Sequence, residues 1–241
     1  MTTVLELSTV SRIHGSGHTA VRALIDVSLV ADAGELVAVM GPSGSGKTTL
    51  LSLAGGLDHP TSGHVLVEGR ELGGLSVAEL ARVRRRRIGY VFQQLNLIDG
   101  LTAAENVSLP LELDGVDRRR ATALAVEALQ RVSMDELADR FPEELSGGEQ
   151  QRVAIARAVV GDRVLLLADE PTGALDSITG EAVLRLMRRH CDDGGCGILV
   201  THDARFAAWA DRVVFLRDGR VIDETTPSSG PEALLSEPVS S

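Results

Sequence analysis

The spacing of apolar residues along the chain predicts strands near both ends. Residues 4–10 and 24–30 alternate apolar with polar positions, which is typical of half-buried strands. Residues 164–168 and 198–201 are almost entirely apolar, as expected for parallel strands that are buried on both faces. Shorter strands are predicted at residues 64–67, 88–92, 213–216 and 220–222. The last two flank Asp218-Gly219, a dipeptide that is typical of a hairpin turn.

A helical period replaces this pattern between residues 95 and 160. Helices in this block are predicted at residues 102–111, 117–132 and 148–160. Further helices alternate with the predicted strands, at residues 47–57, 76–84, 179–190 and 205–210. Strands that alternate with helices predict an α/β fold with a parallel core sheet, into which the middle block is inserted.

The length of the chain, 241 residues, suits one large domain. We predict a single domain at residues 1–224, with its core at about 1–93 and 162–224 and a helical subdomain at about 94–161. Pro, Ser and Glu dominate residues 225–241, and a tail of this composition is expected to be flexible.

Composition narrows the classes of function. The chain has 24 Lys and Arg against 34 Asp and Glu, a net charge of -10, whereas general nucleic-acid-binding proteins are normally basic. We therefore expect no nucleic-acid partner. No stretch approaches about 20 consecutive apolar residues, so no transmembrane helix is predicted. The first residues lack the basic start and long apolar run of a signal peptide, so we expect a cytoplasmic protein.

A glycine-rich loop follows another apolar run, residues 36–40. It fits the pattern G-x-x-x-x-G-K-[ST] at every fixed position, between a predicted strand and a predicted helix, as phosphate-binding loops do. Backbone N–H groups of such a loop turn toward an anion, and the helix N-terminus favours negative charge. Lys47 would reach the β- and γ-phosphates, and the Thr48 hydroxyl would bind Mg²⁺. The residues predicted to contact the nucleotide are Gly41, Pro42, Ser43, Gly44, Ser45, Gly46, Lys47, Thr48 and Thr49.

Two carboxylates, Asp169 and Glu170, follow the apolar run at residues 164–168. They would lie at the carboxyl edge of the sheet, where ligands of α/β folds bind. Asp169 is predicted to hold Mg²⁺, as the second acidic motif of phosphate-loop ATPases does. Glu170 is predicted to activate the attacking water as a general base.

The segment 145–152, with the sequence LSGGEQQR, resembles the signature of the ATP-binding-cassette (ABC) ATPases. With the loop and the acidic pair, it makes residues 4–223 similar to the ATP-binding subunit of ABC transporters. The resemblance implies an α/β phosphate-loop NTPase of the ABC type. Its core sheet would be mostly parallel and accompanied by an antiparallel β-subdomain and a helical insertion.

The resemblance also implies roles for further residues. Gln93 matches the glutamine that contacts Mg²⁺ and the attacking water and senses the membrane partner, and His202 matches the histidine that reaches the γ-phosphate. Asp176 matches the loop that joins the two sites of a dimer. The residues matching those that clamp the γ-phosphate bound to the other subunit are Ser146, Gly147 and Gly148.

Two residues depart from the family pattern. His14 stands where family members usually have an aromatic residue that stacks on adenine, so we expect an imidazole to stack there with less surface. Glu149 stands where many signatures have Gln, and we do not interpret it as inactivating. Segments 92–97 and 101–107 are similar to the branch of lipoprotein-release, macrolide-export and cell-division ATPases.

The resemblance implies partners as well as chemistry. Two copies would enclose ATP and Mg²⁺, and a separate membrane permease would hold them on the inner face of the cell membrane. The surface near residues 93–106 is the predicted docking site. A soluble ABC ATPase of DNA repair or translation remains an alternative, although the insertion here is short. The arginine run at residues 84–87 is interpreted as a solvated helix face, with anionic lipid or an acidic partner left open.

Overall fold

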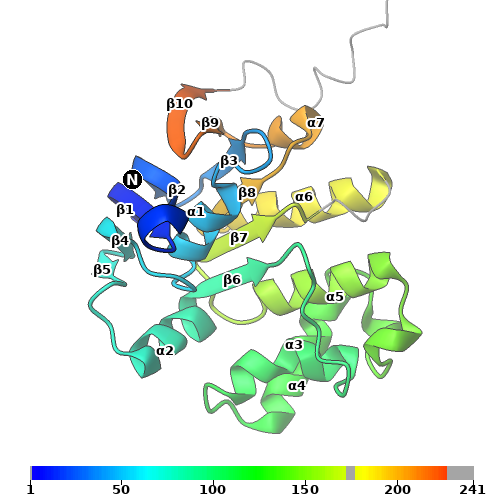
Figure 1. Ribbon diagram of the computed structural model, residues 1–241. Coiled ribbons are helices and arrows are strands. Elements are labelled where there is room, and N and C mark those ends of the chain that lie inside the picture. The colour runs from blue at the N-terminus through cyan, green and yellow to red at the C-terminus, as the bar shows by residue number, and fades with distance from the viewer. Residues whose placement is uncertain (1, 172–176, 227–241) are drawn as a thin grey trace, which may run out of the picture.

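The computed structural model of the chain describes residues 2–171 and 177–226, and for residues 177–179 it describes the backbone alone. A small antiparallel sheet, a larger and mostly parallel sheet, and a separate group of helices make up the described part of the molecule (Figure 1). The predicted fold class, an α/β core with an antiparallel β-subdomain and a helical insertion, is confirmed.

The larger sheet consists of β3 (Leu36–Met40), β6 (Ile88–Val91), β7 (Leu165–Asp169), β8 (Cys196–Val200), β9 (Arg212–Arg217) and β10 (Arg220–Thr225). The strand order is β10-β9-β3-β8-β7-β6, and only β10 runs antiparallel to its neighbour. Every residue of β7 and β8 is buried, because helices or the second sheet cover both faces of these strands. The carboxyl ends of β3, β7 and β8 therefore open at one edge.

The smaller sheet consists of β1 (Thr3–His14), β2 (Val21–Asp32), β4 (Ser62–Val67) and β5 (Arg70–Glu71), in the order β2-β1-β4-β5. β1 and β2 are both longer than the apolar alternation predicts. Their pairing shifts register between Leu7 and Val10, where Thr9 has a φ of 47°, and again between Val10 and Arg12, where Asp26 of β2 has a φ of 49°. Such bulges shift the order in which side chains point to the two faces of the sheet. The strands therefore continue beyond the residues at which the regular apolar and polar alternation stops.

The helices are α1 (Lys47–Ala54), α2 (Val77–Arg87), α3 (Ala103–Glu112), α4 (Arg118–Gln130), α5 (Gly147–Val159), α6 (Ser177–Asp192) and α7 (Ala204–Ala207). Short 3₁₀ helices are η1 (Gly17–Thr19), η2 (Asp135–Leu137) and η3 (Pro142–Glu144). α1 lies between the two sheets, with Leu50 and Leu51 fully buried. α3, α4 and much of α5 form a core of their own around Val107 and Leu129, which is the predicted insertion (Figure 1).

Some helix and strand ends differ from prediction. α1 stops at Ala54 instead of residue 57, because Gly56 takes a φ of +59° and the Leu57 N–H turns back to the Ser52 carbonyl. α7 is shorter than predicted, and β10 extends to Thr225. Residues 227–241 of the predicted tail lie outside the described residues. The division into one domain with the predicted boundaries stays a prediction.

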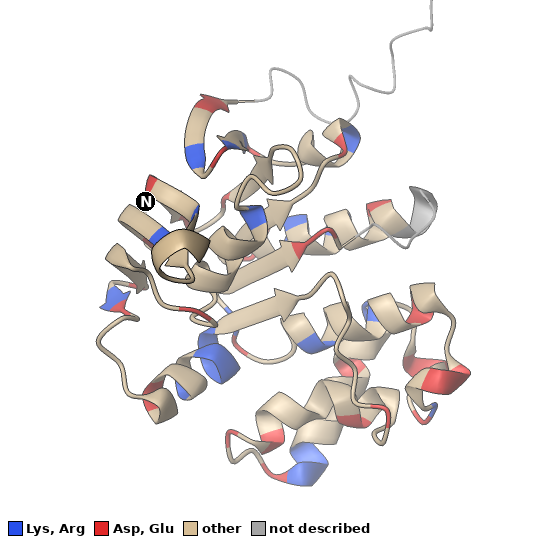
Figure 2. Cartoon of the chain, viewed as in Figure 1, with Lys and Arg blue, Asp and Glu red and all other residues tan. Residues whose placement is uncertain are grey.

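The arginine run lies at the end of α2 (Figure 2), and most of its side chains are paired instead of simply solvated. Arg84 donates to the Gly56 carbonyl at 2.9 Å, Arg86 contacts Asp114 at 2.5 Å, and Arg87 pairs with Glu68. These arginines join α2 to three other segments of the chain. Within the described residues, no helix has the length and apolar composition needed to cross a membrane.

Candidate functional site

The loop between β3 and α1 is built to expose its own N–H groups. Gly41 has a φ of +154°, and a Cβ there would collide with the carbonyl oxygen of Leu216. Gly46 has a φ of +105°, and a Cβ there would lie 2.4 Å from the carbonyl oxygen of Ala23. Gly46 caps α1 without a side chain, so the first N–H groups of the helix receive no side-chain cap. Uncapped N–H groups at a helix N-terminus form an anion site.

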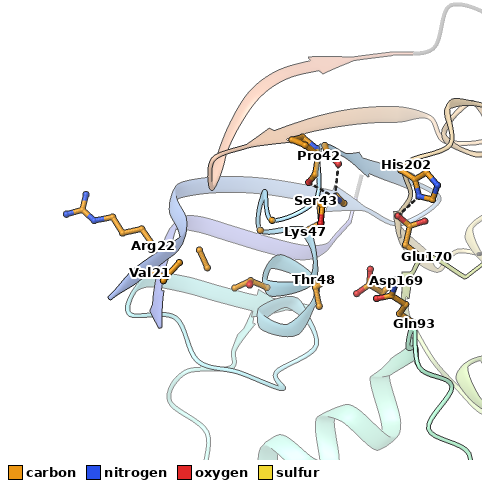
Figure 3. A pocket seen from close by; sticks show the side chains of 15 residues that line it. Val21, Arg22, Pro42, Ser43, Lys47, Thr48, Gln93, Asp169, Glu170 and His202 are labelled. Carbon is orange, nitrogen blue, oxygen red and sulfur yellow. Dashed lines mark hydrogen bonds and ion pairs between the residues drawn. The ribbon is translucent and has the colours of Figure 1, made fainter. Parts of the chain in front are cut away.

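This loop forms one wall of a cavity of about 510 Å³, a size that suits a nucleotide (Figure 3). Residues from β2, the loop, α1, the carboxyl end of β7 and the segments after β6 and β8 meet there. The lining residues are Val21, Arg22, Ala23, Gly41, Pro42, Ser43, Gly44, Gly46, Lys47, Thr48, Thr49, Gln93, Asp169, Glu170 and His202. The structure thus gathers most of the predicted site residues into a single cavity.

Lys47 is held by the loop itself. Its Nζ donates to the Gly41 carbonyl at 2.7 Å and to the Pro42 carbonyl at 3.0 Å. An ammonium has three donor hydrogens, so these bonds leave capacity for one anionic oxygen without rearrangement. Lys47 therefore lines the cavity beside the loop backbone and can donate one more hydrogen bond.

Asp169 is the last residue of β7 and is 4% exposed. The pKa of its carboxyl group is raised, mainly because the group is buried, and the negative charge of Glu170 adds to this effect. A hydrogen bond from Thr48 and the positive charge of Lys47 act in the opposite direction. A buried carboxylate beside a hydroxyl offers hard oxygen ligands, and the Gln93 amide lines the same side of the cavity (Figure 3).

Glu170 and His202 face each other at this end of the cavity (Figure 3). His202 Nδ1 lies 2.9 Å from Glu170 Oε1, and the Glu170 N–H donates to the Val200 carbonyl at 3.0 Å. Glu170 has a φ of 48°, and its side chain is 17% exposed. The hydrogen bond and negative charge of Glu170 raise the pKa of the His202 imidazole. The predicted base and histidine are therefore in direct contact.

The opposite end of the cavity is formed by Val21, Arg22 and Ala23 at the start of β2. His14 does not line the cavity, but it pairs directly with Val21 across β1 and β2. Directly opposed residues have neighbouring side chains on one face of a sheet. His14 also lies within β1 instead of beyond it. Val21 and Arg22 were not predicted as site residues. They lie at the start of β2, opposite the end of β1, and the apolar pattern predicts neither of these strand ends.

Other predicted site residues lie elsewhere. Ser45 is 2% exposed and does not line the cavity, because the turn closed by its N–H to the Pro42 carbonyl directs its hydroxyl toward Gly41. Ser146 caps α5 and exchanges hydrogen bonds with Glu149, so Glu149 has a structural place in the signature. The signature residues Ser146, Gly147 and Gly148 do not line the cavity. Asp176 lies outside the described residues.

Comparisons with known proteins agree with this geometry. The sequence model of the ABC transporter family matches residues 24–173. The macrolide export ATP-binding/permease protein MacB of Salmonella typhimurium is 46% identical over 222 residues, and that of Escherichia coli K12 is 43% identical. Each alignment covers 92% of this chain and 34% of the relative, so the chain spans about a third of the length of these relatives.

Solved structures show the same relationship. The dimeric, post-hydrolysis structure of the ATP-binding cassette MJ0796 with ADP and Pi superposes with a TM-score of 0.88 and 41% sequence identity. The match covers 93% of this chain and 99% of that one. A second dimeric structure of MJ0796, described as a bacterial ABC transporter cassette, matches equally well. The chain therefore belongs to the ABC transporter family, as an ABC-type ATPase cassette.

Proposed function

We propose that the chain binds and hydrolyses ATP with Mg²⁺ and couples this reaction to a separate membrane permease. One observation carries the proposal: a single cavity joins Lys47 and Thr48 of the phosphate loop to Asp169, Glu170 and His202. Loop N–H groups and Lys47 bind the phosphates, and the hydrolytic residues lie where the terminal phosphate would be attacked.

Thr48, Asp169 and Gln93 are the residues that would hold Mg²⁺. Their hydroxyl, carboxylate and amide oxygens are the ligands that Mg²⁺ prefers, and all three line the cavity. When bound, the ion would neutralise charge on the transferred phosphate. Glu170 accepts a proton from the attacking water as general base. His202 positions Glu170 through their hydrogen bond and can itself donate to the γ-phosphate.

The base of ATP would lie at the Val21 end, because the phosphate loop and Glu170, which would meet the phosphates, lie toward the other end of the cavity (Figure 3). His14, next to Val21 on the same face of the sheet, is our candidate for the stacking residue. A single imidazole ring gives less contact area than a phenol. Arg22 lines the same end and can place its guanidinium plane against the base.

The signature implies a second copy of the chain. Ser146, Gly147 and Gly148 lie at the N-terminus of α5, in the helical group and apart from the cavity of their own chain. A helix N-terminus with small residues is an anion site. We propose that it closes over the γ-phosphate bound to a second copy, as the dimeric state of MJ0796 suggests. Asp176 stays a predicted contact between the two sites.

A groove of about 380 Å³ between α2, β6 and α3 is our candidate docking site for the permease. It adjoins the predicted stretch 93–106 instead of lying within it, since its lining includes Phe92 and Leu109. Exposed apolar side chains at its rim are those of Leu57 and Leu113. The charged residues that line it are Arg84, Arg85, Arg157 and Arg163, with no Asp or Glu among the described lining residues.

The arginines that line this groove favour a particular kind of partner. Arg157 and Arg163 donate hydrogen bonds to backbone carbonyls, and neither forms an ion pair with a carboxylate of the described residues. The groove therefore favours a short apolar helix that carries an acidic side chain. Such a partner in a permease would hold the chain at the inner face of the cell membrane.

The Lys47→Ala variant tests the nucleotide site. We expect it to lose ATP binding, because the backbone N–H groups alone do not offset the phosphate charge. Equilibrium binding of labelled ATP, with circular dichroism to establish that the variant is folded, measures this. Arg119 is exposed on α4 and does not line the cavity, so Arg119→Ala, expected to keep its ATP affinity, separates a site-specific effect from a general loss of positive charge. Unchanged affinity in Lys47→Ala would remove Lys47 from the site.

A further inference from the structure

The turn between β9 and β10 contacts the phosphate loop, although neither Asp218 nor Gly219 lines the cavity. The Gly219 N–H donates to the Ser45 carbonyl at 3.0 Å. The Gly219 carbonyl accepts from the Ile25 N–H of β2 at 2.8 Å. β2 forms the opposite end of the cavity through Val21 and its neighbours. One residue of the turn therefore joins the phosphate loop to the strand at the other end of the site.

The bond to Ser45 fixes the direction of a neighbouring N–H group. In a trans peptide the carbonyl of one residue and the N–H of the next point in opposite directions. The described residues contain no cis peptide bond, so the Gly46 N–H points away from Gly219. Gly46 lines the cavity, and within the described residues its N–H has no hydrogen-bond acceptor. The turn thus aims a free donor toward the space where phosphate would bind.

Close packing supports the same arrangement. Gly41 and Gly46 lie too close to the carbonyls of Leu216 and Ala23 for either to carry a Cβ. Leu216 is in β9, directly before the turn, and Ala23 is in β2. The loop therefore packs against β2, which Gly219 contacts, and against β9, which precedes Gly219 in the chain. We therefore expect a displacement of the turn from β2 to disturb both ends of the loop.

We propose that Gly219 is a positioning residue for nucleotide binding, which holds the Gly46 amide in line with the phosphates. The proposal rests on the proposed ATP site and adds to it a residue outside the cavity. A Cβ at Gly219 would lie 2.9 Å from the Ala23 carbonyl oxygen and 3.2 Å from the Leu24 Cα. Any side chain there pushes the turn off β2 and weakens its bond to Ser45.

The chain contains a matched control in the turn between β4 and β5. Gly69 has a φ of +73°, close to the +74° of Gly219, and the preceding residues Glu68 and Asp218 have φ angles of 50° and 48°. A Cβ at Gly69 meets nothing within 4 Å, unlike a Cβ at Gly219. Alanine therefore introduces the same backbone strain at both positions, and only Gly219→Ala disturbs contacts with the nucleotide site.

The experiment compares Gly219→Ala with Gly69→Ala in the full chain. We expect Gly219→Ala to raise the Kd and KM for ATP about tenfold. This is the effect expected when one hydrogen bond to a charged group, here from the Gly46 N–H to a phosphate, is weakened. The kcat at saturating ATP should stay within about twofold, since the hydrolytic residues are not displaced. Gly69→Ala should leave Kd and KM within about twofold of wild type on the same scale. Equal ATP affinity in the two variants would overturn the proposal.

A second pair of variants covers the case in which the alanine variants fail to fold. Asn tolerates positive φ angles better than Ala, so Gly219→Asn and Gly69→Asn have less backbone strain but keep the same contrast in contacts. Again only the Gly219 variant should lose ATP affinity. The two proposals fail separately: a wild-type chain that does not bind ATP overturns the proposed function. If the wild-type chain binds ATP and the Gly219 and Gly69 variants bind it with equal affinity, only the positioning role is overturned.

Discussion

At the residue scale, Glu170 is our proposed general base, because it contacts His202 and directly follows the last residue of β7. We predict that Glu170→Gln keeps ATP binding and lowers turnover by about 10²–10⁴-fold, the usual contribution of a general base. Gln preserves size and hydrogen bonding but does not accept the proton from water. Phosphate release and ATP binding, measured on one preparation, test this. Turnover within about twofold of wild type would rule out Glu170 as the base.

The contact between Glu170 and His202 also predicts a pH effect. The pKa of His202 is raised by the hydrogen bond from its ring to Glu170 and by the charge of that carboxylate. The imidazolium therefore persists above its ordinary pKa of about 6.5 and is lost as pH rises through the raised value. His202 is largely exposed, so the effect on stability is small.

An NMR titration of the histidine ring resonances measures this pKa in the nucleotide-free protein. We expect the His202 pKa to lie above the ordinary value and to fall back toward it in Glu170→Gln, because a neutral amide removes the negative charge. A His202 pKa that does not respond to Glu170→Gln would mean that the two side chains are apart in solution.

At the scale of helices and strands, the sequence predicts what local pattern controls. β7 and α3 were predicted from apolar runs and helical spacing, and the structure confirms both with ends shifted by a residue or so. The phosphate loop and the acidic pair were also predictable, because each is a short contiguous motif next to a buried strand. Their meeting in one cavity follows from parallel strands that end at one edge.

Contacts between distant segments were not predictable from local pattern. The Gly219 bond to Ser45 joins positions far apart in the chain, and nothing in the spacing of apolar residues encodes it. The bulge at Thr9 hides the full length of β1, so the partner of His14 was missed. The arginine run has the composition of a solvated helix face, but Asp114 and Glu68 come from other segments to pair with it. In each case tertiary structure overrides a local preference.

At the scale of the whole molecule, the cavity and the signature lie in different parts of the fold. The cavity is built from the two sheets and α1, whereas Ser146 lies in the helical group with α3 and α4. We therefore expect a site that uses both to be completed by a second chain. ATP that binds only between two chains stabilises the dimer by mass action, and hydrolysis releases it.

Mixing two inactive variants tests this shared site. Lys47→Ala chains have a damaged cavity, and Ser146→Arg chains have a damaged signature, so each is expected to be inactive alone. A mixed dimer keeps one intact site, formed by the cavity of one chain and the signature of the other. We predict that mixing restores part of the wild-type ATPase rate. Light scattering with ATP present should detect dimers in the mixture, because each mixed dimer keeps one intact ATP site, and fewer dimers in either variant alone.

The matched control mixes Lys47→Ala with Glu170→Gln. Lys47 and Glu170 line the same cavity, so both changes damage the same half of the site and every mixed dimer has two defective cavities. No recovery is expected from this mixture. Recovery in the first mixture and not in the second follows only if the signature acts on the other chain. If neither mixture recovers while light scattering shows mixed dimers, the signature does not complete the site of a second copy, and hydrolysis must take place within one chain.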